Sequence, residues 1–299
     1  MKVLLFGKLG QVGWELQRSL APLGEVIALS ASDQSYCGDL SNLQGIADTV
    51  RQIRPGVIVN AAAYTAVDKA EAEPELVRLI NAEAAAILAK EAKALDALLV
   101  HYSTDYVFDG HGTKPWVESD ATNPLSVYGA KKLAGEAAIQ ASGCQHIIFR
   151  TSWVYAARGN NFAKTMLRLA TERDELSVID DQFGAPTGAE LLADVTAHVI
   201  QHVKHNPELA GLYHLAASGE TTWHDYACFV IDFARKNGQQ LKVVSNKINR
   251  VSTSAFPTPA TRPGNSRLDT SKLESSFKLT LPHWQSGVTR MLTEILEKK

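Results

Sequence analysis

The chain has 299 residues, of which 45% are hydrophobic and 21% are charged, and its formal net charge is −2. This composition is that of a globular protein of roughly two domains. The small net charge argues against a nucleic-acid or membrane-surface partner, and no apolar run approaches the about 18 residues of a membrane span. The N-terminal apolar run is too short for a signal peptide, and three widely spaced cysteines argue against a disulfide framework. We therefore expect a cytoplasmic protein.

Short apolar runs alternate with amphipathic stretches through the first half of the chain. The apolar runs predict buried parallel strands, and the stretches between them have the spacing of helices with one apolar face. This alternation predicts a doubly wound parallel α/β sheet of the Rossmann type with right-handed crossovers. We expect strands at residues 3–6, 26–29, 57–60, 98–102 and 146–150, and helices at 11–23, 42–53 and 74–95.

The strand–helix rhythm weakens after Trp153. We expect residues 1–152 to form a dinucleotide-binding domain. Residues 153–299 should form mainly a smaller, interleaved α/β substrate lobe, with one or two strands returning to the main sheet. The expected strands are 176–179 and 212–215, and the expected helices are 161–171, 189–202, 223–237 and 284–296.

A glycine-rich turn, Gly7-x-x-Gly10-x-x-Gly13, follows the first strand and leads into a helix that opens with Gln11 and Val12. Strand, glycine turn and helix together are the context of a dinucleotide fingerprint, because glycine backbone and a helix N-terminus accept a pyrophosphate. A glycine turn without a ligand is the alternative. The spacing differs from the usual G-x-G-x-x-G, and Ser30 after the second strand is no acid, so NADH and NADPH both stay open.

Residues at the carboxyl ends of the later strands extend this predicted site, since ligands bind at that edge of such sheets. Asp39-Leu40 suits an adenine contact, although an Asp before a helix is often an N-cap. Small residues follow the third strand and let a flat cofactor lie against the backbone. The expected cofactor contacts are Gly7, Gly10, Gln11, Val12, Gly13, Ser30, Asp39, Leu40, Ala62, Ala63, Tyr64, Tyr102, Tyr128 and Lys132.

Tyr128 and Lys132 are four residues apart, so a helix places them on one face. An ammonium beside a phenol lowers the pKa of the phenol and makes it a proton donor. A solvated helix face is the alternative for this pair alone.

Four features occur together: the glycine turn, Asn60-Ala61-Ala62-Ala63, Ser103-Thr104-Asp105, and Tyr128-x-x-x-Lys132. Together they resemble the extended short-chain dehydrogenase/reductases. Residues 103–110 resemble the signature of the dTDP-4-dehydrorhamnose reductases, and residues 181–187 and 262–269 strengthen that similarity, which spans almost the whole chain.

The resemblance implies reduction of the C4 ketone of dTDP-4-dehydro-β-L-rhamnose to dTDP-L-rhamnose, in nucleotide-sugar and cell-surface polysaccharide biosynthesis. Hydride would come from NADPH or NADH, and the proton from Tyr128. The implied catalytic set is Thr104, Tyr128 and Lys132. The implied substrate contacts are Thr65, Thr104, Asp105, Trp153 and Arg262. Simple packing is an equal alternative for Trp153, as is a structural salt bridge for Arg262.

The resemblance also associates Mg²⁺ with the protein, but no spacing locates a site, and we interpret Asp180-Asp181 as a solvated turn. The sequence leaves the oligomeric state open, with a homodimer as one option.

Two other functions stay open at this point. A nucleotide-sugar 4-epimerase would use the same scaffold, although epimerases of this kind usually carry a small hydroxyl residue where Asp105 stands. A regulatory binding subunit would have no need of an intact Thr104, Tyr128 and Lys132. Related dehydratases carry an acid pair after this threonine, and Tyr106 breaks that pattern.

Overall fold

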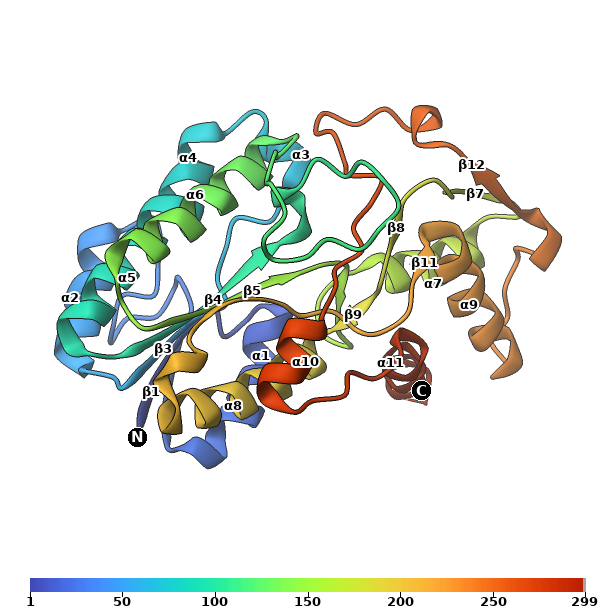
Figure 1. The fold of residues 1–299 in the computed structure, drawn as a ribbon. Coiled ribbons are helices and arrows are strands. Elements are labelled where there is room, and N and C mark those ends of the chain that lie inside the picture. The colour runs from blue at the N-terminus through green and yellow to red at the C-terminus, as the bar shows by residue number, and fades with distance from the viewer. Residues whose placement is uncertain (298–299) are drawn as a thin grey trace.

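The structure, a computed structural model, describes residues 1–297 and centres on a parallel sheet of six strands in the order β10-β5-β4-β3-β1-β2 (Figure 1). All five neighbouring pairs are parallel. The doubly wound α/β fold predicted from the sequence is therefore confirmed. Its strands are β1 Lys2–Phe6, β2 Glu25–Leu29, β3 Val57–Asn60, β4 Leu98–Thr104, β5 His146–Thr151 and β10 Gly211–His214.

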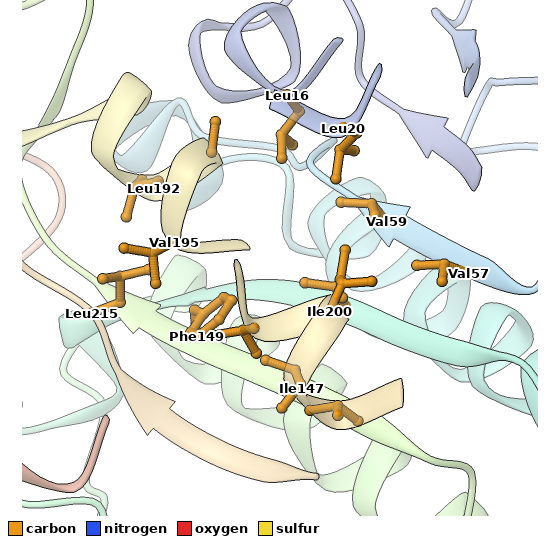
Figure 2. Packing of buried hydrophobic residues seen from close by; sticks show 14 of the residues in the cluster. Leu16, Leu20, Val57, Val59, Ile147, Phe149, Leu192, Val195, Ile200 and Leu215 are labelled. Atoms are coloured by element: carbon orange, nitrogen blue, oxygen red, sulfur yellow. The ribbon is translucent and has the colours of Figure 1, made fainter. Parts of the chain in front are cut away.

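Helices cover both faces of this sheet because side chains on each strand alternate between two apolar faces. On β1, Val3 and Leu5 point into one core, whereas Leu4 and Phe6 point into the other. The first core packs against α1 (Gln11–Leu20), α8 (Ala189–His205) and α10 (Ser271–Phe277), and Figure 2 shows its side chains. The second core packs against α2 (Leu43–Ile53), α5 (Ala84–Leu95) and α6 (Val127–Ser142).

A third core lies in the smaller lobe, which Figure 1 shows at the right. Buried Tyr226, Val230 and Trp284 belong to it. Two segments from the second half of the chain nevertheless join the main sheet: β10 pairs with β5, and α8 packs against α1. The elements of the lobe are α7 Phe162–Glu172, α9 Trp223–Lys236, α11 Trp284–Glu297, β6 Val154–Tyr155, β7 Leu176–Ile179, β8 Phe183–Gly184, β9 Thr187–Gly188, β11 Thr221–Thr222 and β12 Ile248–Val251.

The predicted helix over residues 74–95 is interrupted by a π turn, η2 (Leu79–Glu83), between α4 (Pro74–Arg78) and α5. Buried Asn81 lies in this turn and bonds the backbone N–H and C=O of Tyr64. The sequence pattern missed α3 (Val67–Ala70), α10, β12 and the short helical turns η3 Asp105–Val107, η4 Pro207–Leu209, η5 Ser245–Lys247 and η6 Thr253–Ala255. The turn η1 Ala21–Leu23 forms the end of the helix predicted over residues 11–23. Within residues 1–297, every helix is too short or too polar to cross a membrane.

The strand order reverses between β1 and β3, because β1 has β2 on one side and β3 on the other. Connections leave these two strands toward opposite sides, which opens a crevice at their carboxyl ends. Gly7 follows β1 at this point and Ala61 follows β3. The fold thus places the glycine turn at the position where such sheets bind ligands.

Candidate active site

A cleft of about 540 Å³ opens at the carboxyl ends of β1, β3, β4 and β5, with α6 along one side. Most of the residues predicted from the sequence line it. They are Gly7, Gly10, Gln11, Val12, Ala62, Ala63, Thr65, Tyr102, Thr104, Asp105, Tyr128, Lys132 and Trp153. The predicted residues outside its wall are Gly13, Ser30, Asp39, Leu40, Tyr64 and Arg262.

The glycine turn fits closely against its neighbours. Gly7 has a φ of +93°, which favours glycine, and a Cβ there would lie 2.8 Å from the Ala61 backbone. A Cβ at Gly13 would lie 2.0 Å from the Gly7 carbonyl oxygen, so α1 packs directly on the turn. Gly10 is less crowded, and as the N-cap of α1 it offers no side-chain acceptor. The first N–H groups of α1 therefore face the cleft free of a side-chain cap, an arrangement that fits the pyrophosphate of a dinucleotide.

Three side chains at the end of β2 form what we call the β2 end of the site: Lys8, Ser30 and Asp33. Lys8 Nζ lies 2.7 Å from Asp33, and Asp33 accepts hydrogen bonds of 2.6 Å from both the backbone N–H and the hydroxyl of Ser30. These donors, the Lys8 ammonium first, lower the pKa of Asp33 to about 2. The charges at this end are thus paired with each other.

The remaining predicted residues outside the cleft wall have partners of their own. Asp39 accepts from the backbone and hydroxyl of Ser41, the local turn bonding that was the alternative to adenine contact. The Leu40 side chain is buried in the second core. The Tyr64 hydroxyl donates to Glu73 at 2.6 Å.

Helix α6 carries Tyr128 and Lys132 into the cleft. Ser126 caps its N-terminus by accepting from the Gly129 N–H at 3.2 Å. Gly129 lets the helix lie against the turn after β4, since a Cβ there would be 2.2 Å from the Tyr106 carbonyl oxygen. The glycine next to the tyrosine therefore sets how close the phenol comes to Thr104.

Lys132 is buried and bonds to β4 rather than to Tyr128. Its Nζ lies 2.5 Å from the Tyr102 carbonyl oxygen and 3.0 Å from Nε2 of His101. Burial lowers the pKa of Lys132 to about 8. Burial, together with the Asp105 carboxylate, raises the pKa of Tyr128 to about 12. The lowered tyrosine pKa expected from the sequence is therefore wrong for this arrangement, because Tyr128 is desolvated and the Lys132 Nζ bonds β4 instead.

The side chains of Thr104, Asp105, Thr151 and Ser152, at the ends of β4 and β5, meet at the floor of the cleft. Together with Tyr128 and Lys132 we call them the β4 end of the site. The Thr104 hydroxyl donates to Asp105 at 3.0 Å, and it also bonds the Tyr128 phenol. Burial raises the pKa of Asp105 to about 6. The sequence analysis assigned no role to Thr151 and Ser152, although hydroxyl residues at the carboxyl end of a parallel strand indicate a ligand-binding position. Within residues 1–297, three buried oxygens here have no hydrogen-bond partner: Asp105 Oδ2, Thr151 Oγ1 and Ser152 Oγ.

Trp153 and Arg262 both show the contacts of their structural alternatives. Trp153 has a φ of +49° and stacks on Trp223 with 3.6 Å between ring centroids, yet it also lines the cleft. Arg262 donates to Asp68 at 2.8 Å and borders a neighbouring cavity of about 300 Å³. Among residues 1–297 its Nη1 has no partner, although it is buried.

A group of acids near β12 does not fit a metal ion. Asp180, His224 and Asp225 bring their ligand atoms within 4.8 Å of one another. The Arg250 guanidinium, however, already lies 2.7 Å from both carboxylates. Asp181 accepts instead from the N–H and hydroxyl of Thr253. This arginine supplies the positive charge at the cluster, so we assign no step to Mg²⁺ there.

Comparison with known proteins agrees with this geometry. Residues 1–297 match the family described as RmlD substrate binding domain. The chain is 64% identical over 295 residues to a dTDP-4-dehydrorhamnose reductase of Salmonella typhimurium, which covers 99% of this chain and 98% of the relative. A solved dTDP-4-dehydrorhamnose reductase from Clostridium acetobutylicum has a TM-score of 0.90 at 35% identity, covering 99% of each chain. Another from Bacillus anthracis, in complex with NADP, has a TM-score of 0.86 at 35% identity, covering 98% of this chain and 99% of that one. The chain therefore belongs to the dTDP-4-dehydrorhamnose reductase family.

Proposed function

We propose that this chain reduces the C4 ketone of dTDP-4-dehydro-β-L-rhamnose to dTDP-L-rhamnose with NADPH or NADH. One observation carries the proposal: Thr104, Tyr128 and Lys132 line one cleft with the glycine turn at the N-terminus of α1. The relatives that share up to 64% of the sequence carry this activity in their names. The cofactor follows from the same cleft and from a relative of the same family solved with NADP.

The reaction adds a hydride to the ketone carbon and a proton to its oxygen. When bound, reduced nicotinamide supplies the hydride. Tyr128 supplies the proton: its raised pKa, about 12, keeps the phenol protonated until charge develops on the ketone oxygen. Thr104, a hydrogen-bond partner of that phenol, orients it and shares the ketone oxygen. Lys132 would hold the ribose hydroxyls of the bound cofactor and stabilise the phenolate that remains.

We assign sugar recognition to the unpartnered oxygens at the floor of the cleft. Asp105 Oδ2, Thr151 Oγ1 and Ser152 Oγ are buried, and a buried polar atom left unpaired costs about 1–3 kcal/mol, so a ligand that bonds them gains this energy. Thr65 and Trp153 border the same space. Arg262 would contact the diphosphate only through Nη1, since Nη2 is held by Asp68.

We further propose that residues 1–152 bind the dinucleotide and that most of residues 153–299 bind the nucleotide sugar. The predicted cofactor contacts of Ser30, at the β2 end, and of Asp39 and Leu40 belong to this proposal. We also propose a cytoplasmic location, supported by the three free thiols of Cys37, Cys144 and Cys228. A homodimer is the oligomeric state to test, by light scattering.

Turnover with dTDP-4-dehydro-L-rhamnose, followed through the absorbance of NADPH and then of NADH, tests the function. We expect stoichiometric oxidation of the cofactor and formation of dTDP-L-rhamnose. Tight copurification of NAD together with C4 epimerisation would support the epimerase instead. Cofactor that stays reduced with every 4-keto sugar, while the protein captures a partner enzyme, would support the regulatory subunit.

A further inference from the structure

Next to Lys132 lies a pair of buried polar side chains that the proposed mechanism does not use, and one of them, Asn60, also lines the cleft. Asn60 ends β3 and His101 lies in β4, and the two are direct neighbours in the sheet register. Asn60 and His101 are each 1% exposed, and Lys132 is 2% exposed. Asn60 Nδ2 lies 3.1 Å from His101 Nδ1, and His101 Nε2 lies 3.0 Å from Lys132 Nζ. The three side chains therefore form a continuous hydrogen-bonded row.

The direction of this row is set at Asn60. Its carbonyl oxygen Oδ1 accepts from the Ala62 N–H at 3.2 Å, so its NH₂ group is the one that faces His101. An amide NH₂ only donates, so His101 Nδ1 must accept. A neutral imidazole that accepts at Nδ1 carries its proton on Nε2. Burial, with the nearby Lys132, lowers the pKa of His101 well below its usual value, so this imidazole is neutral.

An Nε2–H group that faces Lys132 needs an acceptor there. An ammonium has three donors and no lone pair, whereas a neutral amine has one lone pair. The neutral amine can accept from His101 and still donate to the Tyr102 carbonyl oxygen. The ammonium would set two donors against each other at 3.0 Å.

We infer that His101, with its tautomer fixed by Asn60, is a positioning residue that disfavours the ammonium form of Lys132 in this arrangement and ceases to do so when Lys132 turns to oxygen acceptors in the cleft. This inference rests on the proposed function for its catalytic meaning, since the ammonium of Lys132 is then most stable where a phenolate forms.

Other charged groups around Lys132 do not cancel this effect. Glu136, one turn along α6, favours the ammonium. Its carboxylate is nevertheless paired with Arg150 of β5 at 2.7 Å and accepts from the Ser103 hydroxyl. The titratable and charged groups packed around Lys132 are Tyr128 and Glu136 on α6, His101 and Tyr102 on β4, Asp105 after β4 and Arg150 on β5.

The tautomer can be measured directly in the cofactor-free protein. NMR of nitrogen-labelled histidine distinguishes a protonated from a bare ring nitrogen, and the His101 signals are identified by their loss in His101→Gln. We expect the proton on Nε2. A proton on Nδ1, or on both nitrogens near neutral pH, would overturn the inference.

The charge of Lys132 is measured by titrating carbon-labelled lysine side chains, with Lys132 identified by its loss in Lys132→Arg. We expect a midpoint near pH 8 in the unaltered chain. In His101→Gln the amide can present its carbonyl oxygen to the ammonium, so the midpoint should rise by about one pH unit or more. The exposed His111→Gln is the matched control and should leave the midpoint unchanged. An unchanged midpoint in a folded His101→Gln protein would refute the inference, and if that variant does not fold, His101→Asn replaces it in both measurements.

Turnover separates this inference from the proposed function. If both hold, kcat/KM for NADPH at saturating dTDP-4-dehydro-L-rhamnose, which reports the cofactor-free protein, falls at high pH as the Lys132 ammonium is lost, and His101→Gln moves that limb upward with the NMR midpoint. A shifted midpoint in a protein that does not turn over this sugar would contradict the function and leave the inference intact. Normal turnover with an unshifted midpoint would support the function and contradict the inference.

Discussion

The β4 end and the β2 end of the site treat their charges in opposite ways. At the β4 end burial pushes every group toward its neutral form: Asp105 to a pKa of about 6, Lys132 to about 8 and Tyr128 to about 12. At the β2 end the pKa of Asp33 falls to about 2, because Lys8 and Ser30 surround its carboxylate.

This difference follows from where each end lies. The β4 end is enclosed between the sheet and α6, so water cannot solvate a charge there and three oxygens keep unused hydrogen-bonding capacity. The β2 end is partly exposed, with 27% and 25% of the Lys8 and Asp33 side chains accessible. The unpaired buried groups of the β4 end can each form a new hydrogen bond to a substrate. The paired, partly exposed charges of the β2 end can change only the affinity for the cofactor.

The strongest test of the contrast is Tyr128→Phe, which removes the proton donor of the β4 end. We expect kcat to fall by about 10²–10⁴-fold, while the NADPH dissociation constant, measured by fluorescence titration, changes little. Tyr213→Phe, which removes a phenol bonded to the Leu209 carbonyl far from the cleft, is the control. Turnover of Tyr128→Phe close to that of the control would exclude the proposed acid.

The glycine turn connects the two ends, and its glycines should separate fold from binding. Gly13→Ala forces a Cβ against the Gly7 carbonyl oxygen, so we expect it to lower the free energy of unfolding by about 1–3 kcal/mol or more. The matched change Gly10→Ala meets only an ordinary contact of 3.4 Å, so its stability should stay near normal while NADPH binding weakens. Urea denaturation measures the stability of each variant, and cofactor titration measures its affinity for NADPH. Equal losses of stability in Gly13→Ala and Gly10→Ala would contradict the close packing of Gly13 on the Gly7 carbonyl.

The pH profile tests Asp105. Its folded-state pKa is raised, to about 6, so the carboxylate that accepts a sugar hydroxyl is lost as pH falls through 6, and kcat/KM should fall with it. Asp105→Asn cannot titrate, so this acid limb should disappear. At higher pH its kcat/KM should be lower by about tenfold or more, the value of a hydrogen bond to a charged group. An acid limb that persists in Asp105→Asn would assign it to another group.

The smallest effect is expected at the β2 end. Asp33→Asn frees the Lys8 ammonium, which then favours the additional phosphate of NADPH. Because exposed ion pairs contribute about 0.2–1 kcal/mol, the ratio of kcat/KM for NADPH to that for NADH should rise by no more than about fivefold. Exposed Asp174→Asn is the control. A larger fall in turnover with both cofactors would show that the β2 end is as critical as the β4 end.

The sequence predicted the strands of the main sheet because the signals for a strand are local. An apolar run such as Val3–Phe6, followed by a glycine, predicts a strand and a turn without reference to the rest of the chain. The alternation of strands and helices then restricts the sheet to a few possible topologies. The four-residue spacing likewise placed Tyr128 and Lys132 on one helix face. What the spacing missed was where Lys132 points, because its partner His101 comes from β4, 31 residues away in the chain.

By itself, the sequence determined the parallel α/β fold, the glycine turn and the family, since these depend on periodicity and short motifs. Only the tertiary structure decided which polar groups are buried without partners, that Arg250 occupies the acid cluster near β12, and that burial raises the pKa of Tyr128. The reason is physical: desolvation and hydrogen bonding depend on what packs around a group, and those neighbours come from distant parts of the chain.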